Sequence, residues 1–141
     1  MATMWPTDIR ALIDEAGPGW GGLWSLIYTT ERAVGALGQV VSFAEGMDLL
    51  WLGSELSQVA QDLARGHPSD VAVAVAVDLG PLADGEDPDR ARRVVATLIG
   101  AVIARADQLI DARPPTADVI ALTCVASMAF SIRAALSGSL R

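Results

Sequence analysis

The sequence contains no lysine and no asparagine, and its 141 residues include a single cysteine and a single histidine. One cysteine excludes an internal disulfide bond and is typical of a protein in a reducing compartment. With one histidine and one cysteine the usual zinc sites cannot form, and the carboxylates do not follow the Glu-x-x-His pattern of di-iron bundles. We therefore expect no metal and a cytoplasmic location.

Motifs of catalysis and cofactor binding are also missing. The chain has no Gly-x-Ser-x-Gly sequence and no phosphate-binding or dinucleotide-binding pattern, so we expect no cofactor. The glycine-rich residues 17–22 follow no predicted strand and are interpreted as a connection. Cys124 falls in a very apolar predicted helix and is interpreted as an inert, buried cysteine. A catalytic role would require His67, which lies in a predicted loop before a proline.

Positive charge is scarce. Ten arginines stand against 17 acids, and the formal net charge is −7. Nucleic acids and anionic lipid surfaces both attract basic proteins, so the sequence argues against both. The longest uncharged runs, 17–30 and 119–132, are shorter than the roughly 20 residues of a spanning helix, and no signal peptide is recognisable. We expect a soluble protein whose acidic balance is compatible with a basic protein partner.

Apolar residues are abundant and recur at helical spacing. They make up 52% of the chain. Amphipathic patterns and capping signals predict helices over residues 8–16, 23–45, 48–65, 87–112 and 118–136. The sequence therefore predicts an all-α fold: one domain over 1–141, a bundle of about five or six helices with frayed residues 1–6 and 138–141.

The last predicted helix is apolar nearly all round. It carries no charge from residue 119 to 132. A helix of this kind is usually enclosed by other helices or by a second subunit, so we expect it to be central. The surplus of apolar surface in so small a chain predicts a homodimer.

Residues 69–80 are ambiguous. Their VAVAVAV run alternates as a strand does. Ser69 as an N-cap, and Gly80 followed by Pro81, instead favour a helix. Because no other segment resembles a strand, we predict a short helix, with a strand as the alternative.

One side of the predicted helix 23–45 is the first candidate site. It carries Trp24, Tyr28, Glu31, Gly35 and Gly38 at spacings that share a face. A carboxylate and a phenol beside aromatic surface could orient a small ligand, and the glycines would leave room for it. If Glu31 is desolvated, its pKa would rise and it could act as an acid or base.

Three other residues could close the same pocket. Glu45, Asp48 and Trp51 cluster around the predicted turn between two helices, although they could equally be caps and packing residues. In the competing interpretation, Glu31 pairs with Arg105 or Arg133 while the aromatic residues fill the core.

Trp51-Leu52-Gly53 is similar to the Trp-x-Gly turn of small helical hairpins exported by type VII secretion systems. In that family the motif connects two helices. Here it falls within a predicted helix, and no tyrosine-acid export signal follows it. We therefore do not assign the chain to that family.

Three functions are consistent with these features. The leading hypothesis is a non-enzymatic, cytoplasmic, homodimeric helical protein that binds a protein partner or an apolar small molecule. The second is a small cofactor-free enzyme or biosynthetic accessory protein that uses Glu31 and Tyr28. The third is an acidic inhibitor or immunity-type protein whose contact surface is formed by Asp84, Glu86, Asp87 and Asp89. An enzyme requires Glu31 beside a cavity and without an arginine partner.

Overall fold

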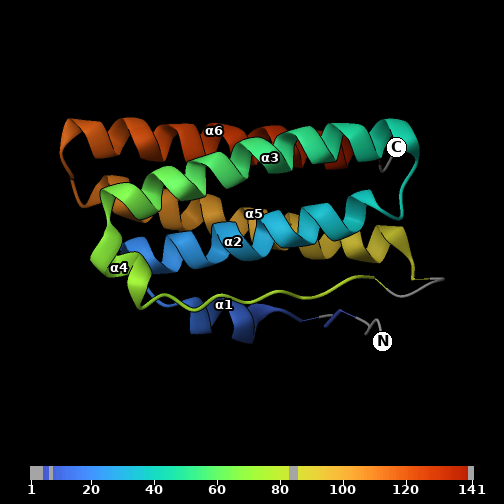
Figure 1. Ribbon diagram of the computed structural model, residues 1–141, viewed down its shortest axis with the longest axis horizontal. Helices are drawn as coiled ribbons and strands as arrows, with labels where there is room; N and C mark the ends of the chain where they lie inside the picture. Colours follow the sequence, from blue (N-terminus) through green and yellow to red (C-terminus); the bar gives the residue numbers. More distant parts are fainter. Residues whose placement is uncertain (1–4, 7, 83–85, 140–141) are drawn as a thin grey trace.

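The computed structural model describes residues 5–6, 8–82 and 86–139 (Figure 1). Within these residues the chain forms six helices and no strand, which confirms the predicted all-α bundle. The helices are α1 (Arg10–Ala16), α2 (Gly19–Gly38), α3 (Phe43–Gly66), α4 (Pro68–Ala72), α5 (Pro88–Asp111) and α6 (Thr116–Ser139).

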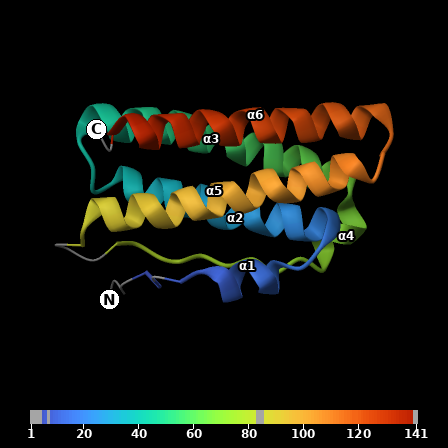
Figure 2. The same cartoon turned by 180° about the vertical axis from the view of Figure 1, so that it is seen from behind.

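Four long helices form the body of the bundle. The hairpin α2–α3 packs on the hairpin α5–α6, with α2 against α5 and α3 against α6 (Figures 1 and 2). Every adjacent pair is antiparallel. The short α1 and an extended segment lie on the side of α2 and α5 that faces away from α3 and α6. The core between the helices is apolar and includes Leu23, Ile27, Leu37, Leu56, Leu98, Val102, Leu122 and Ile132.

α5 begins where the capping residues of the sequence predict a helix start. The Asp87 carboxylate accepts a hydrogen bond from the Asp89 N–H at 3.0 Å, and Pro88 occupies the first helical position. Acids near a helix N-terminus also interact favourably with the positive end of its dipole. The helix predicted over 87–112 is therefore confirmed.

The turn between α2 and α3 does not lie where the sequence predicts it. We expected a helix over 23–45 and a cap at Asp48, but α2 ends at Gly38 and the N-cap of α3 is Ser42, which accepts from the Glu45 N–H at 3.3 Å. Apolar residues keep their helical spacing through the turn, so periodicity alone does not reveal where the turn lies. The two helices approach closely there: a Cβ on Gly46 would lie 2.7 Å from the Gly38 carbonyl oxygen.

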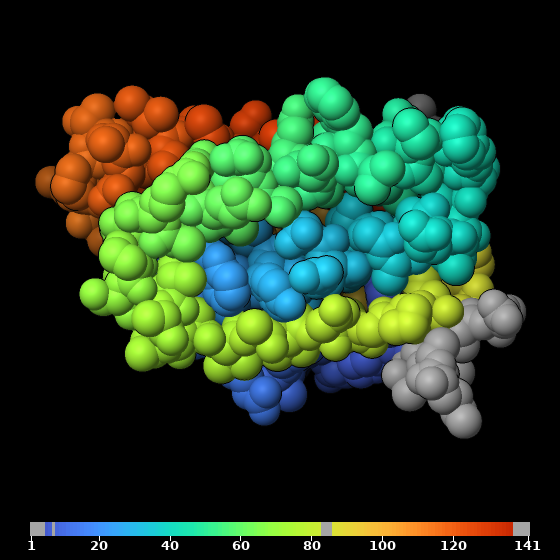
Figure 3. Space-filling model, in the orientation of Figure 1, coloured from blue at the N-terminus to red at the C-terminus, as the bar shows by residue number. Residues whose placement is uncertain are grey.

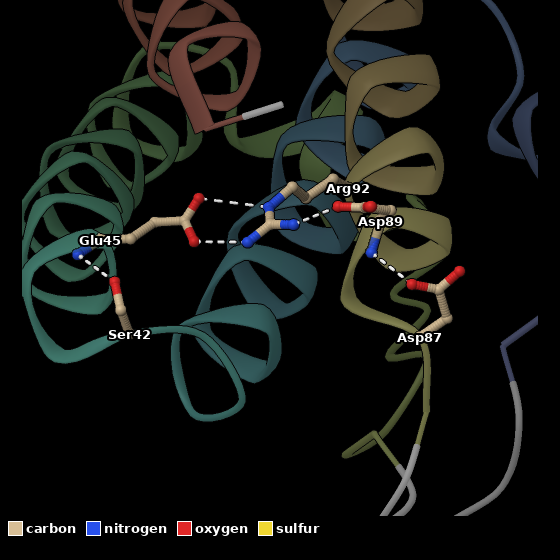
Figure 4. A network of polar contacts seen from close by, with 5 residues as sticks. All are labelled: Ser42, Glu45, Asp87, Asp89 and Arg92. Carbon is tan, nitrogen blue, oxygen red and sulfur yellow. Dashed lines mark hydrogen bonds and ion pairs between the residues drawn. The ribbon is translucent and has the colours of Figure 1, made fainter. Parts of the chain in front are cut away.

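An ion pair joins the beginnings of α3 and α5 (Figure 4). Arg92 Nη2 lies 2.6 Å from Glu45 Oε1, Arg92 Nε lies 3.2 Å from Glu45 Oε2, and the same guanidinium contacts Asp89. Both side chains of the bidentate pair are largely buried. The hydrogen bond with Glu45 is the main reason that the pKa of Arg92 is raised. The pair fastens the end of the bundle at which both helices begin.

The alternating valines belong to the connection between α3 and α5. Only residues 68–72 are helical; residues 74–82 form neither helix nor strand and run extended along α2 (Figures 1 and 3). The predicted short helix over 69–80 is therefore wrong for most of its length. The strand alternative is also wrong, because no neighbouring strand exists in the described residues. We call residues 73–82 the crossover segment.

Hydroxyl groups on α2 donate the hydrogen bonds that a neighbouring strand would otherwise donate to the crossover segment. Ser25 and Thr29, one turn apart and almost completely buried, donate to the carbonyl oxygens of Val75 and Val77, the latter at 2.9 Å. Buried backbone carbonyls require such partners. The crossover segment is therefore held to α2 by side chains at a spacing of four residues.

Trp5 fastens the far end of the same segment. Its indole Nε1 donates to the Gly80 carbonyl oxygen at 3.0 Å, and its side chain is only 1% exposed. Trp5 belongs to the stretch that we expected to fray, so at this residue the chain is instead part of the core.

Within one chain α6 is not enclosed. It occupies a corner of the bundle and exposes Ile120 (61%) and Phe130 (49%). From Thr116 to Leu136 it is long and apolar enough to cross a membrane by length and composition, although core helices meet the same criterion. The apolar stretch 116–136 extends beyond the uncharged run 119–132. The shortness of the uncharged run therefore does not argue against a membrane-spanning helix.

The hydroxyl contacts on the crossover segment predict a stability effect. Thr29→Val keeps the side-chain shape but leaves the Val77 carbonyl without its donor. We expect the free energy of unfolding, measured in urea, to fall by about 1–3 kcal/mol. Hydrogen exchange should accelerate at residues 73–82.

Thr123→Val is the matched control. Thr123 is exposed and its hydroxyl bonds only to the Val119 carbonyl of its own helix. Its replacement should change stability by no more than about 0.5 kcal/mol. Equal losses in the two variants would contradict the role assigned to Thr29.

Candidate functional site

Three adjoining cavities form a groove along the exposed side of α2. Their volumes are about 240, 440 and 340 Å³, and Gly35 lines all three. In Figure 3, α2 lies in a hollow between α3 and the crossover segment. A Cβ on Gly35 would meet no atom within 4 Å, so the glycine leaves the floor of the groove open. We call this feature the α2 groove.

The smallest cavity has apolar walls. It lies at the turn between α2 and α3, where Gly35 and Gly38 form the floor and Phe43, Met47 and Leu50 form the wall. The two larger cavities bring Glu31 together with Asp78 on one side and with polar residues of α3 on the other. Of the residues that the sequence singled out, Glu31, Gly35 and Gly38 therefore share one groove.

Trp24 and Tyr28 do not line these cavities. Their rings stack on each other with centroids 5.3 Å apart, and Trp24 packs against the hydrophobic core. The guanidinium of Arg32 lies 5.3 Å from the centroid of the Tyr28 ring. Trp24 therefore packs against the core, as the competing interpretation predicted, whereas Tyr28 is partly exposed beside Arg32 and does not fill the core.

Glu31 is half-buried beside two cavities. Desolvation by burial raises its pKa; attraction to Arg32 opposes the rise, and repulsion from Asp78 adds to it. In the described part of the chain Glu31 makes no ion pair, so neither Arg105 nor Arg133 is the partner that the competing interpretation requires. The carboxylate is therefore available to a ligand in the groove.

A second candidate surface covers the first turns of α3. Phe43 (84% exposed), Met47 (50%), Leu50 (59%) and Trp51 (68%) lie on its solvent side, and three of them also line the smallest cavity. We call these four residues the α3 patch. Asp48 does not cap the helix and is exposed beside the patch. The sequence analysis found Trp51 and missed the other three. Phe43 and Met47 fell before the predicted start of the helix at residue 48, and Leu50 lay within it without being singled out.

Trp51-Leu52-Gly53 lies inside α3, not in a turn. Gly53 faces α2, where a Cβ would lie 3.3 Å from the Val34 side chain. The glycine therefore serves close packing of two helices, and the resemblance to the Trp-x-Gly turn has no structural basis here.

A separate cavity of about 280 Å³ lies between the end of α3 and the start of α6. His67 Nε2 is 3.2 Å from Asp118 Oδ1, and the imidazole stacks on Trp20 with centroids 3.8 Å apart. Cys124 lines the same cavity but is exposed, so its predicted burial is wrong. No hydrogen bond joins Cys124 to His67 among the described residues. The histidine thus connects the end of α3 to Asp118 of α6 and to Trp20 of α2.

The acids of the proposed inhibitor surface have other roles. Glu86 pairs with Arg90 at 2.6 Å, Asp87 caps α5, and Asp89 contacts Arg92. Asp84 lies outside the described residues. The three acids that lie within the described residues therefore stabilise the start of α5.

Metal ligands do not cluster in the described residues: no three histidine, cysteine, aspartate or glutamate side chains are placed to hold one ion. Comparison with known proteins gives no further guide, since no family model matches the chain and no curated protein or solved structure is similar to it. Function is therefore argued from the surfaces themselves.

The burial of Glu31 predicts a pH-dependent effect of Glu31→Gln. The raised pKa means that the folded state favours protonated Glu31, so the charged form reduces stability at neutral pH. We expect the variant to be more stable at pH 7, by up to about 1 kcal/mol because solvent screens a half-exposed group. The difference should shrink as the pH falls through the pKa of Glu31 and vanish below its ordinary value of 4.5.

Urea denaturation at several pH values measures this difference. Glu15→Gln, at an exposed position of α1, is the control and should show little difference at any pH. A Glu31→Gln variant that is less stable than the natural chain at neutral pH would reveal a favourable partner for the carboxylate.

Proposed function

We propose that this protein is a non-enzymatic binding module that holds a basic amphipathic helix of another protein against the α3 patch. One observation carries the proposal: four large apolar side chains, each at least half exposed, lie together on one side of α3. Scattered exposed apolar residues are ordinary on a protein surface, whereas a contiguous group of this kind marks interaction sites.

The spacing of the patch suits a helical partner. Positions 43, 47, 50 and 51 repeat at the intervals by which one helix presents a face to another. The smallest cavity adjoins the patch, with glycines on its floor and apolar walls. A single large apolar side chain of the partner would enter it and act as an anchor, since binding energy concentrates in such buried residues.

The charge around the patch favours a basic partner. Asp48 and Glu55 lie on α3 beside the apolar residues, and Glu31 and Asp78 line the adjoining groove. Arg32 is the cation among the residues that line the groove. With a net charge of −7, the chain would also attract a basic partner over a distance and accelerate its association.

A second candidate function rests on Glu31. A half-buried carboxylate with a raised pKa, beside two cavities and without an ion pair, meets the requirement for an acid or base in a small enzyme. Tyr28 lies outside these cavities and beneath Arg32, so it does not supply the second group of the predicted pair. Native mass spectrometry of the protein from its own host would test this candidate by detecting a retained small molecule.

The leading proposal is tested with two synthetic amphipathic helices that share a leucine face. One carries lysine on its polar face and the other carries glutamate. Fluorescence anisotropy should show binding of the lysine peptide only, with affinity that falls as salt is added. Trp51→Ala and Leu50→Ser should each weaken binding at least about tenfold, equivalent to about 1.4 kcal/mol.

Val73→Ala is the control for these variants. Val73 is 83% exposed but lies on the crossover segment, so its truncation should leave the affinity unchanged. The proposal is wrong if neither peptide binds, if the glutamate peptide binds equally well, or if the α3 variants keep full affinity.

A further inference from the structure

We propose that the crossover segment binds an extended, basic peptide of another protein, which adds to it as a β-strand. The peptide would pair with the edge of the segment that faces away from α2, which we call the outer edge. This edge is formed by the backbone of Ala74, Ala76 and Asp78. The inference goes beyond the binding of a basic helix and does not depend on it, because the α3 patch contributes no residue to the outer edge.

The contacts with α2 show that the segment has the rise of a β-strand. Ser25 and Thr29 lie one helical turn apart, which is about 6 Å along the axis of α2. They donate to the carbonyl oxygens of Val75 and Val77, which in a strand are about 6.6 Å apart. The two distances nearly agree, so both carbonyl groups reach their donors because residues 75–77 are extended.

The outer edge follows from these contacts. In a strand the N–H and C=O of one residue point to the same edge, and those of the next residue point to the opposite edge. Val75 and Val77 face α2, so the backbone groups of the residues between and after them point away from it. Within the described residues the N–H groups of Ala76 and Asp78 donate no hydrogen bond, and the carbonyl oxygens of Ala74 and Ala76 accept none. Ala76 and Asp78 are exposed, so a partner can reach these groups.

An edge of this kind determines the chemistry of its partner. Its donors and acceptors recur at every second residue, and an extended backbone presents complementary groups at the same spacing. A helix does not, because it uses its own N–H and C=O groups internally. A bilayer does not suit the edge either, since hydrocarbon offers no group that could satisfy the exposed backbone. Unpaired strand edges are templates for the addition of a further strand.

The valines of the segment favour β-branched residues in the peptide. Val75 is 43% exposed and Val77 is partly exposed. Alternate residues of a strand share a side, so both valines would contact the side chains opposite them. β-Branched residues pack well in such cross-strand pairs. We therefore expect valine or a similar residue at two alternate positions of the peptide.

Charge favours a basic peptide over a second copy of this chain. Asp78 lies on the outer edge and lines the same cavity as Glu31. The Asp78 carboxylate accepts the Gly80 N–H at 2.8 Å, and Arg32, beside the same cavity, lies over the Tyr28 ring. A lysine of the peptide opposite Asp78 would form a cross-strand pair of opposite charge. A second copy, with its net charge of −7, would be repelled.

The test uses the peptide Lys-Val-Thr-Val-Thr-Val. In antiparallel pairing its lysine lies opposite Asp78 and its threonines lie opposite Ala76 and Ala74. The threonine N–H groups then donate to the outer edge, whereas the valine N–H groups point away from it. Fluorescence anisotropy should show binding that weakens at least about tenfold when both threonines are N-methylated. N-Methylation of the first two valines adds the same bulk and should leave the affinity unchanged.

A variant of the protein tests the same hydrogen bonds from the other side. Ala76→Pro removes one donor of the outer edge and should weaken binding at least about tenfold. The Ala76 N–H has no partner in the described part of the chain, so the variant should keep the circular dichroism of the natural protein. Ala76→Thr keeps the N–H and is the matched control. Trp51→Ala, which should weaken binding of the lysine-bearing helix, should not affect this peptide.

Several results would overturn the proposal. These are a failure of the peptide to bind, and equal affinity after N-methylation of the threonines or in a folded Ala76→Pro variant. The N-methylated peptides decide the matter even if that variant does not fold. Equal binding of a peptide with glutamate in place of lysine would contradict the choice of a basic partner. A dimer of twice 14.7 kDa in light scattering that Ala76→Pro dissociates would assign the edge to a second copy instead.

Discussion

The bundle depends on how the chain returns from the end of α3 to the start of α5. These two helices run in the same direction, so the connection must travel the length of the bundle. The crossover segment does so in extended form, where its backbone carbonyls have no helical or sheet partners. Ser25 and Thr29 of α2 supply hydroxyl donors from buried positions, and Trp5 supplies an indole N–H. Without these donors the return would carry unsatisfied carbonyls across the surface of α2.

The same return creates the candidate site. Because α3 lies along one side of α2 and the crossover segment along the other, the exposed side of α2 becomes the floor of a groove. Gly35 leaves that floor without a side chain, and Glu31 stands one turn away. If the connection ran along the other side of the bundle, Glu31 and Gly35 would lie on an open face of α2. The topology therefore desolvates Glu31 and raises its pKa.

The sequence predicted those features that depend on neighbouring residues. Asp87 and Pro88 marked the start of α5 because capping is local, and Glu31, Gly35 and Gly38 shared a side because helical spacing is regular. It missed what depends on tertiary contacts. The alternating valines do not form a buried side, since Val73 and Val75 are exposed (83% and 43%). The extended chain is held to α2 through its carbonyl oxygens, and no local pattern shows that side chains of a helix donate to them. Similarly, apolar residues continue through the turn after Gly38, so periodicity alone placed the start of α3 too late and hid the α3 patch.

Two apolar surfaces of the bundle, the α3 patch and the outer face of α6, differ in the charges that surround them, and this difference decides which of them suits a basic partner. The α3 patch lies beside Asp48 and Glu55, which a basic helix would neutralise and a second acidic chain would meet with repulsion. The outer face of α6 has no charge over fourteen residues, so it offers a basic partner no electrostatic advantage. Apolar area provides affinity on both surfaces, whereas the neighbouring charges determine which partner can use each. The α3 patch is therefore the surface on which a basic partner would gain apolar contact and charge attraction together.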